Sequence, residues 1–120
     1  MAGLTAVDAS VLIAFLDDSD THHRAAVDAL IAIERFVVDP ITLAEVLVHP
    51  VRLGREHDVL HRLKAIGMEV SQTPHDAVAL AQLRVKAGLK MPDCIVVALG
   101  QRHGGEVLSF HRGVQRASEP

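Results

Sequence analysis

The chain opens with a short apolar segment that ends in an acid and passes directly into a helical pattern. Residues 4–8 have the composition of a buried strand, and the apolar residues of 11–16 recur at helical spacing. Ser10 stands between them, where a helix N-cap is expected. Open parallel α/β sheets bind their ligands just beyond the carboxyl ends of their strands. The segment therefore predicts that Asp8 lies at the centre of a functional site.

The alternation of short apolar segments with helical patterns continues along the chain. Further strands are predicted at 36–38, 68–71 and 107–109, and helices at 22–33, 40–47, 51–66, 74–87 and 92–99. Pro50 is expected to end or kink its helix, and the residues after 109 form a polar tail. In helix 74–87, the residues expected to face inward are Ala77, Leu80, Ala81 and Ala87. This alternation predicts a parallel sheet with helical crossovers, in one α/β domain over residues 1–120.

Composition narrows the class of protein. The apolar residues are mostly Ala, Val, Leu and Ile, which suits buried parallel strands covered by helices. The net charge of −3 lacks the overall basic footprint of many nucleic-acid-binding proteins, although it does not exclude a local basic rim. Cys94 has no second cysteine to pair with, and no segment approaches the ~20 apolar residues of a membrane span. We therefore expect a soluble cytoplasmic protein that does not enter a membrane.

Three acids stand in apolar or tightly structured surroundings. Asp8 ends the first strand, Glu45 interrupts the apolar run 43–47, and Asp93 begins the most apolar helix of the chain. Buried carboxylates repel one another unless a cation pairs them. If the three converge, the ion of choice is Mg²⁺ or Mn²⁺ with oxygen ligands. Such an ion would generate hydroxide from water and stabilise charge on a phosphoryl group.

Each acid also has a structural explanation that needs no metal. Asp8 could cap the first helix, and Asp93 suits the positive end of a helix. Glu45 could lie on the exposed side of its helix, as glutamates usually do. The residues alone leave these alternatives open.

The order and surroundings of the acids resemble those of the PIN domain family and, within it, the VapC-type toxins of toxin–antitoxin pairs. Residues 7–12 (Val-Asp-Ala-Ser-Val-Leu) resemble the first acidic motif of the family. Residues 42–46 (Thr-Leu-Ala-Glu-Val) resemble the second, and residues 88–95 (Gly-Leu-Lys-Met-Pro-Asp-Cys-Ile) are similar to the third. The third motif is the most specific, and the resemblance extends over nearly the whole chain.

This resemblance implies a three-layer αβα sandwich around a short parallel sheet of four or five strands. It implies an endoribonuclease that depends on Mg²⁺ or Mn²⁺ and hydrolyses RNA as the toxin of a type II toxin–antitoxin system. It also implies a homodimer that a cognate antitoxin inhibits, for example by an apolar helix in a groove near the acids and an arginine that neutralises them. By position, Asp8, Glu45 and Asp93 are the catalytic, metal-binding acids, and Ser10 and Thr42 are supporting hydroxyls.

The last motif departs from the family pattern. Where the family has a fourth acid, in a Thr-x-Asp-like segment after the last strand, this chain has His111. A histidine ligand favours Mn²⁺ or Zn²⁺ over Mg²⁺. We therefore predict either a preference for Mn²⁺, with His111 as a metal ligand, or weakened activity. The alternative is a histidine bonded only to its local surroundings.

Other polar residues offer weaker candidates. Lys90 and Arg112 lie closest in sequence to the acids and are the predicted contacts to the RNA backbone. His57 and His61 have the spacing of a zinc pair on a helix, but an exposed pair without metal is the simpler interpretation. With so few aromatic residues, we expect little base stacking. We expect RNA to be recognised instead by its shape or by hydrogen bonds.

Two other functions compete with the ribonuclease. One is a catalytically weak PIN-fold module that mainly binds RNA or an antitoxin, and it would show binding without metal-dependent cleavage. The other is a metal phosphatase, which would hydrolyse small phosphate esters and leave RNA intact.

Overall fold

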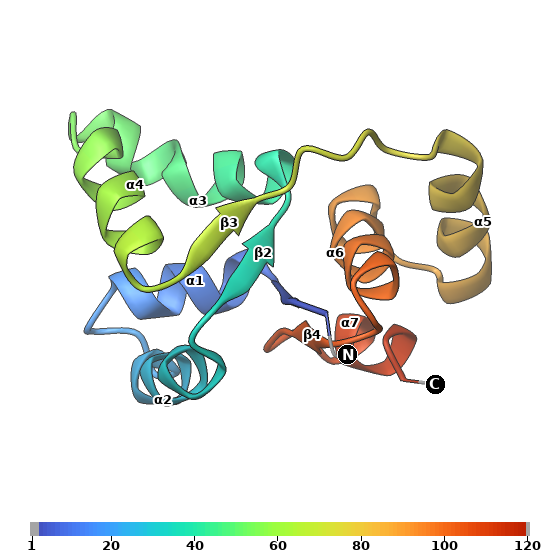
Figure 1. Cartoon of the computed structure of the whole chain (residues 1–120), viewed down its shortest axis with the longest axis horizontal. Coiled ribbons are helices and arrows are strands. Elements are labelled where there is room, and N and C mark those ends of the chain that lie inside the picture. Colours follow the sequence, from blue (N-terminus) through green and yellow to red (C-terminus); the bar gives the residue numbers. More distant parts are fainter. Residues whose placement is uncertain (1–2, 120) are drawn as a thin grey trace.

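The computed structural model describes residues 3–119, which form four parallel strands and seven helices (Figure 1). The strands are β1 (Thr5–Val7), β2 (Phe36–Val38), β3 (Met68–Val70) and β4 (Val107–Leu108). The helices are α1 (Ala9–Leu16), α2 (His23–Ile33), α3 (Pro40–Arg52), α4 (Glu56–Ala65), α5 (Ala77–Ala87), α6 (Met91–Arg102) and α7 (Arg112–Ala117). The sheet order is β3-β2-β1-β4. The prediction of an α/β fold with a short parallel sheet is confirmed.

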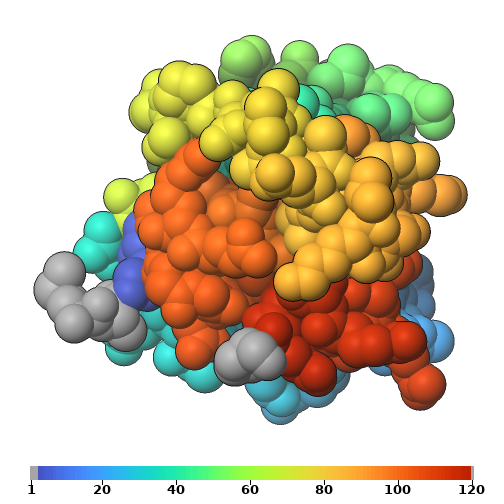
Figure 2. Space-filling view, turned by 90° about the vertical axis from the view of Figure 1, so that its right-hand side faces the viewer, coloured from blue at the N-terminus to red at the C-terminus, as the bar shows by residue number. Residues whose placement is uncertain are grey.

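Helices cover both faces of this sheet. Successive strand residues point to opposite faces, and the residues of β2 are buried on both. Phe36 and Val38 pack with α1, α2, α3 and α4 in the larger core cluster. Val37, between them, packs with Ala6 and with Leu99 of α6 on the other face. Figure 2 shows α6 on this second face, with α5 and α7 beside it. Within residues 3–119, no helix is long and apolar enough to cross a membrane.

The polar residues of the interior gather at one edge of the sheet. Each of the four strands is followed directly by a buried polar residue, namely Asp8, Asp39, Ser71 and Ser109. Thr42, in the first turn of α3, completes the set. The strand order reverses at the β1/β4 pair, which is the switch point where open α/β sheets bind ligands. Asp8 and Ser109 lie directly at this point.

Several predicted helix boundaries are wrong for identifiable reasons. The N-cap of α1 is Asp8 and not Ser10, and α3 continues through Pro50 before it ends. A proline near the end of a helix removes one hydrogen bond without preventing a last turn. The helix predicted over 51–66 accordingly begins at Glu56. The helix predicted from Pro74 begins at Ala77, because the Asp76 side chain accepts a hydrogen bond from the Ala79 amide.

Two predictions for the second half of the chain also fail. Only Leu80 of the four α5 residues expected to face inward is buried, because α5 packs on α6 through a narrow strip. The expected polar tail contains α7, which begins after His111. Val114 anchors this helix, since it is fully buried with the α6 residues.

The connection between β3 and α5 crosses the polar edge of the sheet (Figure 1), and a hydrogen bond between His75 and Asp39 holds it there. His75 Nε2 lies 2.6 Å from Oδ2 of Asp39, whose side chain is 3% exposed. Asp39 Oδ1 accepts a hydrogen bond from the Ile41 amide and so caps α3. The pair therefore joins β2, α3 and the connection.

Replacing His75 with alanine is expected to lower the free energy of unfolding by about 1–3 kcal/mol, because a buried carboxylate loses a hydrogen-bond partner. Urea denaturation of both proteins measures this difference. The control is His57→Ala on the exposed side of α4, expected to change stability by less than ~0.5 kcal/mol. Equal effects of the two variants would show that the hydrogen bond between His75 and Asp39 adds no stability.

Candidate active site

Asp8 is fixed at the switch point by three hydrogen bonds. Its Oδ1 accepts one from the Ala9 amide at 2.8 Å, which caps α1. Its Oδ2 accepts one from Ser109 Oγ at 2.7 Å and one from Ser10 Oγ at 3.3 Å. These donors orient the carboxylate and come from the segments that follow the two strands of the switch point, β1 and β4. The structure thus combines the expected capping role of Asp8 with a position suited to ligand binding.

The other two acids reach the same edge of the sheet from helices. Glu45 lies on the exposed side of α3, and α3 begins directly after β2. Asp93 is half-buried in the first turn of α6. The loop before α6 is held by Arg84, whose Nη1 donates a hydrogen bond to the Leu89 carbonyl at 2.7 Å. Gly88 ends α5 in the left-handed conformation (φ 68°), which glycine adopts most easily.

The pKa of Glu45 links the three acids. It is raised above the ordinary value of 4.5, first by partial desolvation of the carboxyl and then by the negative charges of Asp8 and Asp93. Interactions between charges weaken with distance and with exposure to water. Their effect on Glu45 therefore indicates that Asp8 and Asp93 each lie within electrostatic range of Glu45.

Carboxylate oxygens are the donors that a hard divalent cation prefers. Within residues 3–119, Lys, Arg and His form ion pairs with other acids but with none of these three. Asp8 is only 7% exposed, so its charge lacks both full hydration and a cationic partner. No three His, Cys, Asp or Glu side chains of the described residues form a close ligand group. Mg²⁺ needs only one or two direct carboxylates, because it keeps several waters.

His111 has a different role from the ligand predicted for it. Its Nδ1 accepts a hydrogen bond from the Val114 amide at 3.2 Å, which caps α7. A neutral imidazole whose Nδ1 accepts a hydrogen bond carries its proton on Nε2. In this arrangement neither nitrogen has a free lone pair for a metal. The structure thus supports the alternative of a locally bonded histidine and gives no ground for a preference for Mn²⁺.

The remaining predicted residues divide into two groups. Ser10 contacts Asp8, as a supporting hydroxyl should. Thr42 is buried in α3, but among the described residues its hydroxyl has no hydrogen bond to the acids. Lys90 and Arg112 are exposed at the starts of α6 and α7, where contact with a ligand is sterically open.

Two further candidates lie outside the acid site. His57 and His61 are exposed on α4 and belong to no metal-ligand group of residues 3–119. Cys94 is fully buried in the core cluster around α6, where it packs among apolar side chains. Burial raises the pKa of its thiol, so it is poorly suited to act as a nucleophile.

Sequence reasoning missed Ser109, the closest side-chain partner of Asp8. The signal was available, because Ser109 stands at the hydroxyl position of the Thr-x-Asp-like segment. Its Oγ donates to Asp8 and accepts a hydrogen bond from the His111 amide at 2.9 Å. Ser109 therefore connects the end of β4 to the central carboxylate.

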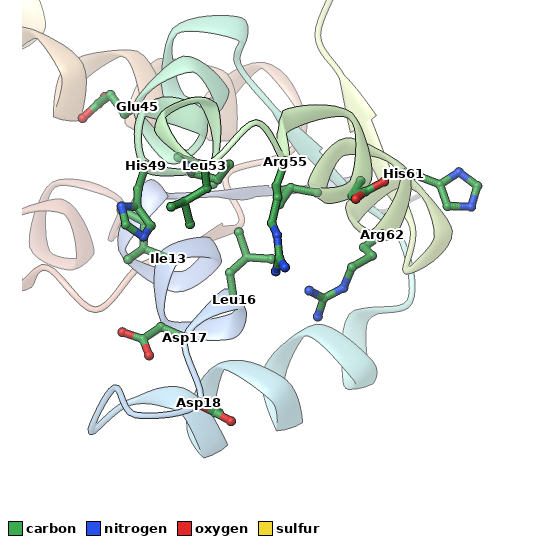
Figure 3. Close-up of a pocket in the computed structure, with 14 residues that line it drawn as sticks. Ile13, Leu16, Asp17, Asp18, Glu45, His49, Leu53, Arg55, His61 and Arg62 are labelled. Atoms are coloured by element: carbon green, nitrogen blue, oxygen red, sulfur yellow. The ribbon is translucent and has the colours of Figure 1, made fainter.

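A groove of about 890 Å³ leads away from Glu45 between α1, α3 and α4 (Figure 3). Its apolar lining includes Ile13, Leu16, Val46, Leu53 and Val59. Glu45 lies at one end of the labelled side chains in Figure 3, and the charged residues of α4 lie at the other. The groove therefore meets the proposed acid site at Glu45.

No curated protein matches the chain. A family model, that of the PIN domain, matches residues 5–120. This match contains the three acids, the hydroxyls around Asp8 and the entire parallel sheet. The chain therefore belongs to the PIN domain family.

Proposed function

We propose that this protein is a divalent-metal-dependent endoribonuclease that acts as the toxin of a type II toxin–antitoxin system. Membership of the PIN domain family supports this proposal, because PIN domains are generally nucleases. The observation that best supports the metal-dependent part of the proposal is the position of Asp8, which is buried at the switch point and accepts hydrogen bonds only from neutral donors. The negative charges of Asp8 and Asp93 also act on Glu45 and help to raise its pKa. A site with this excess of negative charge favours the binding of a cation.

Asp8, Asp93 and Glu45 would hold Mg²⁺ or Mn²⁺, and the oxygen donors suit either ion. When bound, such an ion activates water and neutralises charge on the scissile phosphoryl group. The protein contributes the orientation of Asp8, through the hydroxyls of Ser109 and Ser10. Lys90 and Arg112 would contact phosphates on either side of the cleaved bond, and such contacts position RNA without reading its sequence.

Metal dependence tests the proposal directly. The purified protein is incubated with a single-stranded RNA that is labelled at one end, with EDTA, Mg²⁺ or Mn²⁺. Cleavage is expected with either ion and not with EDTA, and sequencing of the new ends identifies the bond. A single-stranded DNA of the same sequence tests selectivity for RNA. Full cleavage in EDTA would contradict the proposed mechanism.

For the inhibitory partner, we propose an antitoxin that places one amphipathic helix in the groove of Figure 3. The apolar floor suits the apolar side of such a helix, and Arg55 and Arg62 oppose Asp17 and Asp18 among the groove residues. An arginine from this helix could reach Glu45 at the end of the groove. Growth arrest on expression of this chain, relieved by the neighbouring open reading frame, is the expected result. Unimpaired growth without that reading frame would contradict the toxin role.

The proposal includes a homodimer. Ile41, Val48 and Val51 are each about half exposed along one side of α3, where they could pack against a second copy. Sedimentation is expected to give twice the chain mass of 12.9 kDa. A species of single-chain mass at all concentrations would contradict the dimer.

A second candidate function, a weakly catalytic module that binds RNA or an antitoxin, is favoured by one observation. His111 replaces the usual fourth acid and is engaged in capping α7. Binding of RNA or of the antitoxin, without cleavage in either Mg²⁺ or Mn²⁺, would select this function over the ribonuclease.

A further inference from the structure

The rings of His22 and Phe110 form a stacked pair next to the acid site. Their centroids lie 4.9 Å apart, with 29° between the ring planes. Phe110 directly follows Ser109, whose hydroxyl donates to Asp8. Its own amide donates to Ser10 Oγ at 3.2 Å, and Ser10 Oγ donates to Asp8. The backbone that carries Phe110 is thus joined to the central carboxylate on two sides.

The His22 ring is held in place but remains open to solvent. Its backbone amide donates to Asp20 Oδ1 at 2.7 Å, and its Nδ1 lies 3.2 Å from Thr21 Oγ1. One face of the ring packs on Phe110, yet 59% of the side chain is exposed. The opposite face is therefore available to another flat group. An ordered aromatic surface beside a phosphate-cleaving site suits an unpaired nucleobase.

We propose that the His22–Phe110 pair is the base-stacking surface of the nuclease, and this inference rests on the function proposed above. The base of a nucleotide next to the scissile phosphate stacks on the free face of His22, and Phe110 supports the ring from behind. Sequence-specific recognition of RNA mostly uses unpaired bases stacked on aromatic side chains. The stacking selects single-stranded over paired RNA, because a base within a duplex offers no free face.

The test measures stacking separately from cleavage. A set of single-stranded RNAs, each with one 2-aminopurine at a successive position, is titrated with the protein in EDTA. Stacking quenches the fluorescence of 2-aminopurine, and quenching is expected at one or two neighbouring positions. Because stacking contributes about 1–3 kcal/mol per base, His22→Ala should weaken binding by roughly 5- to 150-fold and abolish the quenching.

Conservative variants separate stacking from a structural role. His22→Phe and Phe110→Tyr keep flat rings and are expected to retain the quenching, whereas Phe110→Leu is expected to lose it. His57→Ala serves as a control on the exposed side of α4. Thermal unfolding identifies any variant that does not fold. The His22 variants are expected to fold, because the side chain of His22 is largely exposed.

The outcomes distinguish this inference from the proposed function. If the wild-type protein cleaves RNA but His22→Ala quenches fluorescence as the wild type does, the stacking surface is wrong and the nuclease stands. If the wild-type protein neither binds nor cleaves RNA with Mg²⁺ or Mn²⁺, both are wrong. Loss of quenching in His22→Ala together with retention in His22→Phe would establish the stacking surface.

Discussion

Replacing Asp8 with asparagine is expected to reduce metal-dependent RNA cleavage by roughly 10²- to 10³-fold, the usual loss when a group that acts on transition-state charge is removed. The amide keeps the shape of the carboxylate but removes the charge that would hold the cation. The fold should survive, because asparagine caps helices about as well as aspartate. Initial rates at saturating Mg²⁺, with circular dichroism of both proteins, measure the two effects separately.

The chain offers a matched control for this variant in Asp39→Asn. Asp39, like Asp8, is a buried residue that follows a strand and caps the next helix. It differs in having His75 as a partner, whereas Asp8 has only neutral donors. Asp39→Asn should therefore leave the cleavage rate within a few-fold of the wild type and lower stability by about 1–3 kcal/mol. Equal losses of activity in both variants would show that any buried acid at this edge is needed, and would remove Asp8 from its special role.

Much of the fold can be predicted from the sequence because its signals are local. The strand at 36–38 is a run of three apolar residues bounded by Asp39 and Pro40, and the structure has it at the predicted residues. The positions of Asp8 and Asp93 at the starts of helices could be predicted in the same way, since each stands where an apolar segment meets a helix. Glu45 could be selected as a candidate site residue because its charge interrupts an apolar run.

The connections between distant segments could not be predicted, because no local pattern encodes them. The hydroxyl of Ser109 meets Asp8 only once β4 has paired with β1. The rings of Phe110 and His22 stack only in the folded chain, because the two residues are far apart in the sequence. A count of aromatic residues, on which the expectation of little base stacking depended, could not predict this pair. His111 illustrates the same limit, because its role as a cap depends on α7, which the polar composition of the tail conceals.

Glu45→Gln is expected to stabilise the metal-free protein while it impairs cleavage. The folded chain raises the pKa of Glu45 above its ordinary value of 4.5, so the unfolded chain ionises first as the pH rises. Ionisation of Glu45 therefore favours the unfolded state at neutral pH, and the penalty disappears below the ordinary pKa. The variant lacks this penalty. Its melting temperature in EDTA should exceed that of the wild type at neutral pH and approach it below pH 4.5.

Bound Mg²⁺ should reverse this order. A ligand at ~100 times its dissociation constant stabilises the fold by about 2.7 kcal/mol, on the order of 10 °C for a domain of this size. We expect the wild type to gain most of this shift on addition of Mg²⁺, and Glu45→Gln to gain much less because one metal-binding acid is gone. The matched variant is Glu106→Gln, an exposed glutamate outside the site, which should behave as the wild type in both conditions. If Mg²⁺ raises the melting temperature of all three proteins equally, the cation binds elsewhere and Glu45 is not a metal-binding acid.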